Sequence, residues 1–143
     1  MVPARLSVVT LGARDVAGLR AFYERLGWTS PSPPGPEFAH FEVGGAVLTL
    51  YSLDALASDV GLPAPAAGGF AGFTCAINVE REQMVDEAIE AARQAGARVL
   101  AEPVTRDWGG RSGYFADPED NVWEVAWLPG SGFDERGALI WPA

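Results

Sequence analysis

Few side chains in this sequence have the types and spacing that catalytic or metal chemistry requires. His40 is the only histidine and Cys75 the only cysteine among 143 residues. One chain therefore offers no site built on two histidines, no zinc cluster and no internal disulfide. Ser7, Ser52 and Ser112 have no histidine at matching strand positions, and Cys75 faces the helix side of its predicted strand, so no nucleophilic triad can be drawn. Glu124 stands out because it is a carboxylate on the same face of a predicted strand as the apolar residues Val122 and Ala126.

Neutral polar and aromatic side chains supply the other candidates. Thr74 and Asn78 share one face of a strand predicted over residues 73–79 and offer polar contacts to a ligand. Trp108 stands before Gly109-Gly110-Arg111 in a pliable loop, where an indole beside a guanidinium can stack on a planar ligand. Arg111 is equally suited to pair with surface carboxylates. No helix begins after the glycine pair, so it does not form a phosphate cradle.

The composition limits the class of protein. Ten basic residues against nineteen acidic ones give a net charge of −9, which argues against nucleic acid and membrane surfaces as partners. This charge suits cationic ligands, or it only keeps the protein soluble. No run approaches about 18 consecutive apolar residues, and the N-terminus has no secretory pattern. We therefore expect one cytoplasmic domain over residues 1–143.

The chain repeats one pattern of elements, which must position these side chains. Alternating β-branched residues predict strands, and apolar residues three or four apart predict amphipathic helices. In residues 5–52 the predicted elements are a strand over 5–11, a helix over 16–26 capped by Asp15, and strands over 28–30, 38–43 and 46–51. In residues 72–128 they are a strand over 73–79, a helix over 82–95, and strands over 98–101, 113–116 and 122–128. The predicted linker over 53–71 contains a helical turn, and the tail over 129–143 can add an edge strand.

Gly44-Gly45 between two strand-like runs is typical of a β-hairpin with a two-residue turn. Such a turn places His40 opposite Thr49 and Phe38 opposite Tyr51, and directly opposed residues share a face. This mixed face is where a ligand can bind. The other face is uniformly apolar and is expected to pack against the helix; it consists of Ala39, Phe41, Val43, Ala46, Leu48 and Leu50.

Three stretches of the chain resemble a known superfamily. The first is Thr10-Leu11-Gly12-Ala13-Arg14-Asp15 with Ala21-Phe22-Tyr23-Glu24-Arg25-Leu26-Gly27-Trp28. The others are Asp107-Trp108-Gly109-Gly110, and Gly113-Tyr114-Phe115-Ala116-Asp117-Pro118 with Asn121-Val122-Trp123-Glu124-Val125. They resemble the vicinal oxygen chelate proteins, which include glyoxalase I, bleomycin-resistance proteins and extradiol dioxygenases. The resemblance covers nearly all of residues 5–128 and implies an α+β fold in which two βαβββ modules form a cupped mixed sheet.

Metal-using members of this superfamily hold their metal in the cup through up to four His, Gln or Glu side chains. The positions that correspond here are Val8, Thr49, Thr74 and Glu124. Only Glu124 matches, because valine has no donor atom and threonine hydroxyls bind divalent transition metals poorly. Adding His40 gives two donors, fewer than the three protein ligands of a catalytic metal site. We therefore expect neither a metal nor another cofactor.

The implied cup gives Glu124 and His40 two alternative roles each. In a hollow where burial favours the protonated carboxyl, Glu124 is a candidate general base or acid; alternatively, it hydrogen-bonds across the sheet and only orders the cup. His40 is a proton shuttle beside Glu124 or a structural hydrogen-bonding residue. The expected ligand-binding residues are Thr10, His40, Thr49, Tyr51, Thr74, Asn78, Trp108 and Arg111.

Three functions are compatible with these expectations. The first is a homodimer, as the resemblance implies, whose metal-free cups bind an aromatic or cationic small molecule and sequester an antibiotic or metabolite. The second is a metal-independent isomerase or lyase with Glu124 as the base, assisted by His40 or Tyr51. The third, which the ligand positions favour least, is a metal-dependent glyoxalase or dioxygenase.

Overall fold

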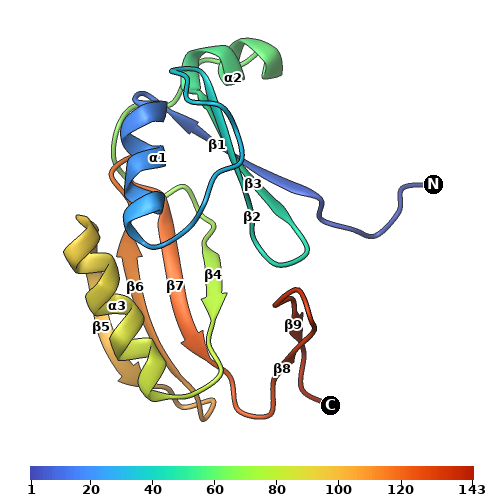
Figure 1. Cartoon of the computed structure of the whole chain (residues 1–143), viewed down its shortest axis with the longest axis vertical. Coiled ribbons are helices and arrows are strands. Elements are labelled where there is room, and N and C mark those ends of the chain that lie inside the picture. The colour runs from blue at the N-terminus through green and yellow to red at the C-terminus, as the bar shows by residue number, and fades with distance from the viewer. The chain divides into compact units, whose positions relative to one another are not determined.

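The computed structural model describes residues 1–143 and divides the chain into two compact units. The first unit comprises Met1–Pro65 with Glu135–Ala138, and the second comprises Ala66–Asp134 with Leu139–Ala143. Each unit contains a mixed β-sheet with a helix packed on one face, which confirms the predicted α+β class (Figure 1). No helix in the protein combines the length and hydrophobicity needed to cross a bilayer.

The sheet of the first unit has three strands in the order β1-β3-β2. Strand β1 runs parallel to β3, and β2 is antiparallel to β3. The elements are β1 (Val8–Ala13), α1 (Val16–Arg25), β2 (Phe38–Glu42), β3 (Val47–Ser52) and α2 (Leu53–Val60). Helix α1 begins where expected because the carboxylate of Asp15 accepts from the backbone N–H of Gly18 at 2.9 Å. It ends at Arg25, and Gly27 just beyond the C-cap has a positive φ of 94°, which suits glycine.

The hairpin between β2 and β3 has the predicted register. His40 pairs with Thr49 and Phe38 with Tyr51, and both turn glycines have positive φ, 71° at Gly44 and 96° at Gly45. The apolar face packs against α1 as predicted. Its buried members are Ala39, Phe41, Leu48 and Leu50, which meet Val16, Leu19, Phe22 and Tyr23 of the helix.

One prediction for the first unit is wrong, and another gives an element that is too short. Residues 28–30 form no strand, because the ring of Trp28 stacks on Tyr23 at 5.1 Å and Arg20 of α1 holds the carbonyls of Ser32 and Pro33. The predicted helical turn after β3 is instead the eight-residue helix α2. Ser52 caps that helix through the N–H of Ala55, at 3.4 Å.

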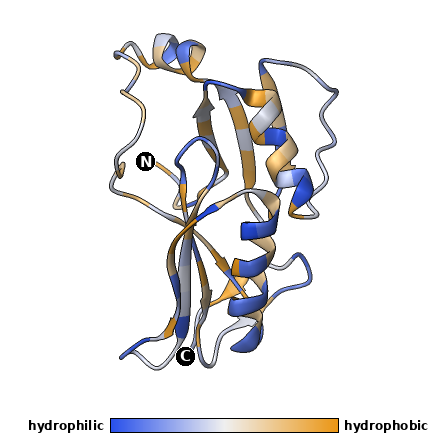
Figure 2. Ribbon diagram, turned by 90° about the vertical axis from the view of Figure 1, so that its left-hand side faces the viewer, coloured by the Kyte–Doolittle hydropathy of each residue, from blue (hydrophilic) through white to orange (hydrophobic).

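The sheet of the second unit has four strands in the order β4-β7-β6-β5, and α3 covers one face. The elements are β4 (Cys75–Asn78), α3 (Gln83–Ala95), β5 (Arg98–Thr105), β6 (Arg111–Ala116) and β7 (Val122–Trp127). Figure 2 shows hydrophobic and hydrophilic residues alternating along α1 and α3, as in helices with one face on a sheet. The core of this unit contains Val85, Ile89, Ala92, Phe115, Trp123 and Val125.

Strand β5 continues through Pro103 instead of stopping before it, which corrects the prediction of a strand over 98–101. The strand lies at the edge of the sheet, and its pairing with β6 shifts register between Ala101 and Val104. Proline has no N–H to donate, and an edge strand with a bulge tolerates this loss. The tail adds no strand to either main sheet; it forms a separate pair from β8 (Gly132–Phe133) and β9 (Leu139–Ile140).

Candidate functional site

Each sheet has one face on its helix and carries polar side chains on the other. We call Thr10, His40, Thr49 and Tyr51 of the first unit the first polar face. We call Asn78, Arg106, Ser112, Tyr114 and Glu124 of the second unit the second polar face. The two faces belong to different units.

The first polar face contains a row of side chains across the three strands. Thr10 pairs with Thr49, and Thr49 pairs with His40. The hydroxyl of Thr49, a residue only 9% exposed, donates to the oxygen of Thr10 at 2.7 Å. The ring of Phe38 lies 6.2 Å from that of His40 and adds an aromatic contact surface beside the row.

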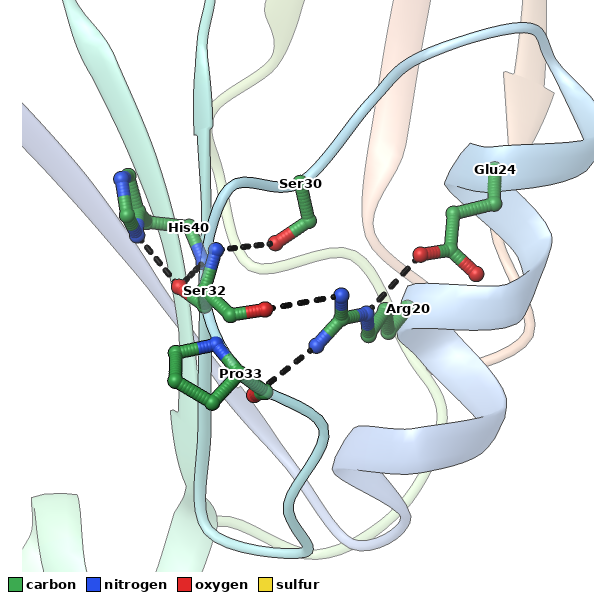
Figure 3. A network of polar contacts seen from close by, with 6 residues as sticks. All are labelled: Arg20, Glu24, Ser30, Ser32, Pro33 and His40. Atoms are coloured by element: carbon green, nitrogen blue, oxygen red, sulfur yellow. Dashed lines mark hydrogen bonds and ion pairs between the residues drawn. The ribbon is translucent and has the colours of Figure 1, made fainter.

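A network of polar contacts connects His40 to the loop before β2 and to helix α1 (Figure 3). The hydroxyl oxygen of Ser32 contacts Nδ1 of His40 and accepts from the backbone N–H of the same residue at 3.1 Å. Arg20 donates to the carbonyls of Ser32 at 3.0 Å and Pro33 at 3.1 Å, and it pairs with Glu24 at 2.9 Å. The loop before β2 therefore has polar contacts with both α1 and His40.

A hollow of about 490 Å³ adjoins this face at the turn end of the hairpin. It is lined by Glu42 and Val47, which continue the mixed face, and by Arg136 from the tail. The same tail segment lies against the turn, since a Cβ at Gly44 would come within 3.1 Å of the carbonyl oxygen of Gly137.

Glu124 on the second polar face has a hydrogen-bond partner across the sheet. It pairs in register with Tyr114, whose hydroxyl donates to Glu124 Oε2 at 2.5 Å, and both side chains are half-buried. This bond raises the pKa of the Tyr114 hydroxyl above its usual value because the carboxylate stabilises the protonated phenol. Burial adds to the increase, and the charge of Arg106 opposes it.

Arg106 lies over the same cluster from the loop after β5. Its guanidinium donates through Nε to the hydroxyl of Ser112 at 2.8 Å and is 5.8 Å from the centre of the Tyr114 ring. Trp108 on this loop is 49% exposed and packs over Gly110, where an added Cβ would overlap the indole. The loop therefore presents a cation and an aromatic ring near the second polar face.

The other predicted binding residues, Asn78, Thr74 and Arg111, do not all lie on the second polar face. Asn78 shares the face of Glu124, because its pairing partner Ala126 is two residues along β7, and Thr74 is exposed just before β4. Arg111 lies on the opposite face of β6, where its Nε and Nη2 donate to the two carboxylate oxygens of Asp86 in α3, each at 2.7 Å. Of the two alternatives for Arg111, the structure therefore shows the pairing with a surface carboxylate.

Several residues of these clusters escaped the sequence analysis. Tyr114 could have been found by applying the hairpin argument to the turn over 117–121, which sets it opposite Glu124. Arg106 and Ser112 lie outside the predicted strands over 98–101 and 113–116, although Ser112 is a buried residue of β6. Ser32 lies in an irregular proline-rich segment, where no periodic pattern indicates which side chain turns inward.

The chain belongs to the Glyoxalase/Bleomycin resistance protein/Dioxygenase superfamily, whose family model matches residues 5–125. It is similar to a solved glyoxalase-related enzyme from Fulvimarina pelagi, with 30% identity and a TM-score of 0.89 over 99% of this chain and 100% of that one. A family enzyme from Burkholderia phytofirmans PsJN has 24% identity and a TM-score of 0.76 over 87% and 99%. A Nocardioides family member has 26% and 0.70 over 93% and 89%. No curated protein matches. The predicted glyoxalase-like fold is confirmed.

The side chains at the four metal-ligand positions of this superfamily do not fit a metal ion. Val8 has no donor atom, Thr49 donates its hydroxyl to Thr10, and Thr74 is a neutral, exposed hydroxyl. One oxygen of Glu124 already accepts from a tyrosine. Within neither unit do three His, Cys, Asp or Glu side chains gather closely enough to hold an ion.

Proposed function

We propose that this protein binds a small organic molecule without a metal ion, with Glu124 accepting a hydrogen bond from an amine or hydroxyl group of the ligand. The observation that carries the proposal is the 2.5 Å bond from Tyr114 to Oε2. A carboxylate has about four lone-pair sites, so the bond orients the group and leaves Oε1 for a ligand. In a half-buried setting, such a charge-assisted bond is stronger than in bulk water.

Two further features support a ligand of this kind. The net charge of −9 favours cationic molecules over anionic ones. Arg106 donates to Ser112 rather than to Glu124, so the carboxylate has no arginine partner to compete with a ligand cation. Sequestration of an antibiotic or a metabolite fits this chemistry, because retention needs affinity and no turnover.

The proposal is tested by thermal shift with benzylamine and bleomycin as probes. A ligand that binds the native state at about 100 times its Kd stabilises it by about 2.7 kcal/mol. We expect Glu124→Gln to abolish the stabilisation by the binding probe. The matched control is Glu87→Gln, which makes the same charge change at an exposed position of α3 and should bind as the wild type does. Equal stabilisation of both variants would contradict the proposal.

A metal-independent isomerase or lyase with Glu124 as the base is the second candidate, favoured because Tyr114 orients the carboxylate. In such a reaction, the carboxylate removes a proton from a carbon atom of the substrate. Each compound that binds would be incubated with the protein in D₂O, and its mass would be measured by mass spectrometry. Deuterium incorporation that disappears in Glu124→Gln supports catalysis, and no incorporation and no product leave binding alone.

We also propose the homodimer that the superfamily resemblance implies, and light scattering after size exclusion tests it. The mass of two chains is expected, and the mass of one chain at micromolar concentration would refute it. The cytoplasmic location stays a prediction, which fractionation of cells producing the native protein tests.

A further inference from the structure

Every polar atom of Ser32 has a partner within the chain. The residue is 8% exposed. Its N–H donates to Ser30 Oγ at 3.3 Å, and its carbonyl accepts from Arg20 at 3.0 Å. Its hydroxyl oxygen accepts from the backbone N–H of His40 at 3.1 Å and contacts Nδ1 of that residue. The serine is thus fixed from α1 on one side and from β2 on the other (Figure 3).

These contacts determine which nitrogen of His40 carries the proton. The Ser32 hydroxyl has one proton to donate, and Nδ1 of His40 is the only acceptor that it contacts. Buried hydroxyls donate their proton wherever an acceptor is within reach, so the bond runs from Ser32 to Nδ1. A neutral imidazole has one donor and one acceptor nitrogen. With Nδ1 as the acceptor, the ring proton lies on Nε2.

The Nε2 atom is available to a ligand. It has no partner within the chain, and no buried side-chain nitrogen or oxygen lacks a hydrogen bond. It must therefore reach the surface. In Figure 3 this second ring nitrogen lies on the far side of the imidazole from Ser32 and α1.

We propose that Ser32 fixes His40 as the Nε2–H tautomer, so that the first polar face presents a hydrogen-bond donor to a ligand oxygen, either carbonyl or carboxylate. Thr10 supplies a second donor, because its oxygen accepts from Thr49 and its own proton is left for an outside partner. The tautomer follows from the contacts of Ser32 alone. The ligand assignment rests on the small-molecule binding proposed above.

Arg20 acts on His40 only through Ser32 and is a positioning residue. It holds two successive carbonyls of the loop, those of Ser32 and Pro33, with one guanidinium. Its pairing with Glu24 one helical turn away keeps that guanidinium directed at the loop. The planar fork of arginine makes these bonds together, and lysine has no equivalent geometry.

The tautomer can be measured directly, because His40 is the only histidine in the chain. The experiment uses ¹⁵N-labelled, untagged protein at about pH 9, well above the reference histidine pKa of about 6.5. A long-range ¹H–¹⁵N correlation spectrum separates protonated from unprotonated ring nitrogens. We expect Nε2 protonated and Nδ1 unprotonated, each at the limiting shift of one tautomer. A proton on Nδ1, or averaged shifts in the wild type, would overturn the proposal.

Two variants separate the role of the hydroxyl from that of the loop. Ser32→Ala removes the donor, and both ring shifts should move toward those of an interconverting mixture. Ser32→Thr keeps a hydroxyl and should retain the shifts of the wild type. Equal spectra for all three proteins would overturn the role of Ser32, and if Ser32→Ala does not fold, the wild-type spectrum still decides the tautomer.

The ligand assignment is tested with benzamide and benzoate as neutral and anionic oxygen acceptors, and with benzylammonium as a probe that only donates. We expect at least one acceptor to shift the Nε2 signal; which of the two does so identifies carbonyl or carboxylate. His40→Phe should weaken its binding about tenfold, whereas His40→Gln keeps an N–H donor and should bind within about threefold of the wild type.

The outcomes distinguish the two proposals. A shift by benzylammonium alone would overturn the donor assignment of this face while binding itself stands. Binding of none of the probes, with the Nε2–H tautomer observed, would count against small-molecule binding at this face and not against the role of Ser32.

Discussion

The bond between Tyr114 and Glu124 is expected to contribute measurably to stability. Tyr114→Phe removes the hydroxyl and leaves the ring in place. Hydrogen bonds to charged groups contribute about 1.5–3 kcal/mol. Because both side chains are half-buried, we expect the free energy of unfolding to fall by about 1.5 kcal/mol, the lower end of this range. At about 2.1 cal/mol/K of unfolding entropy per residue, a loss of this size lowers the melting temperature of the 143-residue chain by about 5 °C.

Urea unfolding followed by circular dichroism measures this loss, with Tyr51→Phe as the matched control. Tyr51 lies on the first polar face, and its hydroxyl has no hydrogen bond within the chain, so its removal should change stability by less than about 0.5 kcal/mol. A double-mutant cycle with Glu124→Gln should give a coupling energy of about 1 kcal/mol. If Tyr114→Phe behaves like Tyr51→Phe, or if the coupling is below about 0.3 kcal/mol, the reasoning is refuted.

The pH dependence gives an independent check of the same bond. Because the folded state raises the pKa of Tyr114, the contribution is fully present below the ordinary tyrosine pKa of about 10. It is lost as the pH rises through the higher folded pKa, when phenolate and carboxylate repel each other. The stability difference between wild type and Tyr114→Phe should therefore be constant to about pH 9 and shrink above about pH 10. In Glu124→Gln, tyrosinate absorbance should appear at lower pH than in the wild type.

Three further predictions concern other parts of the protein. Dialysis against EDTA and addition of Zn²⁺ or Ni²⁺ should leave the melting temperature unchanged, and a rise with metal concentration would contradict the donor argument. Arg111→Ala should cost at most about 0.5 kcal/mol in urea unfolding, since its ion pair is solvent-exposed. The hydrogen bond from Arg111 lowers the pKa of Asp86, so this effect should be present above about pH 4 and be lost as pH falls through the lower folded pKa; an equal effect at about pH 2 would contradict it. Gly110→Ala should cost about 1–3 kcal/mol, because a Cβ there meets the Trp108 ring and the Trp127 carbonyl, whereas Gly35→Ala, with open space around it, should be nearly neutral.

Local signals in the sequence predicted most elements and one complete register. The Gly44-Gly45 turn admits positive φ at both positions, which fixes the pairing of His40 with Thr49. The caps at Asp15 and Gly27 likewise depend on residues close in the chain. The errors arose where a distant contact overrides local preference. Trp28 packs on Tyr23 instead of entering a strand, and β5 passes through Pro103 because its outer edge needs no partner.

The sequence by itself determined which residue types are present, and therefore the lack of metal donors at three of the four family positions. It also determined the faces on which His40, Thr49 and Glu124 lie, because strand alternation is a local property. Only the tertiary structure decided their partners. Ser32 reaches His40 from an aperiodic loop, and Arg111 turns to Asp86 on a helix 25 residues earlier in the chain. A side-chain hydrogen bond depends on the meeting of two segments in space, and sequence spacing does not encode that meeting.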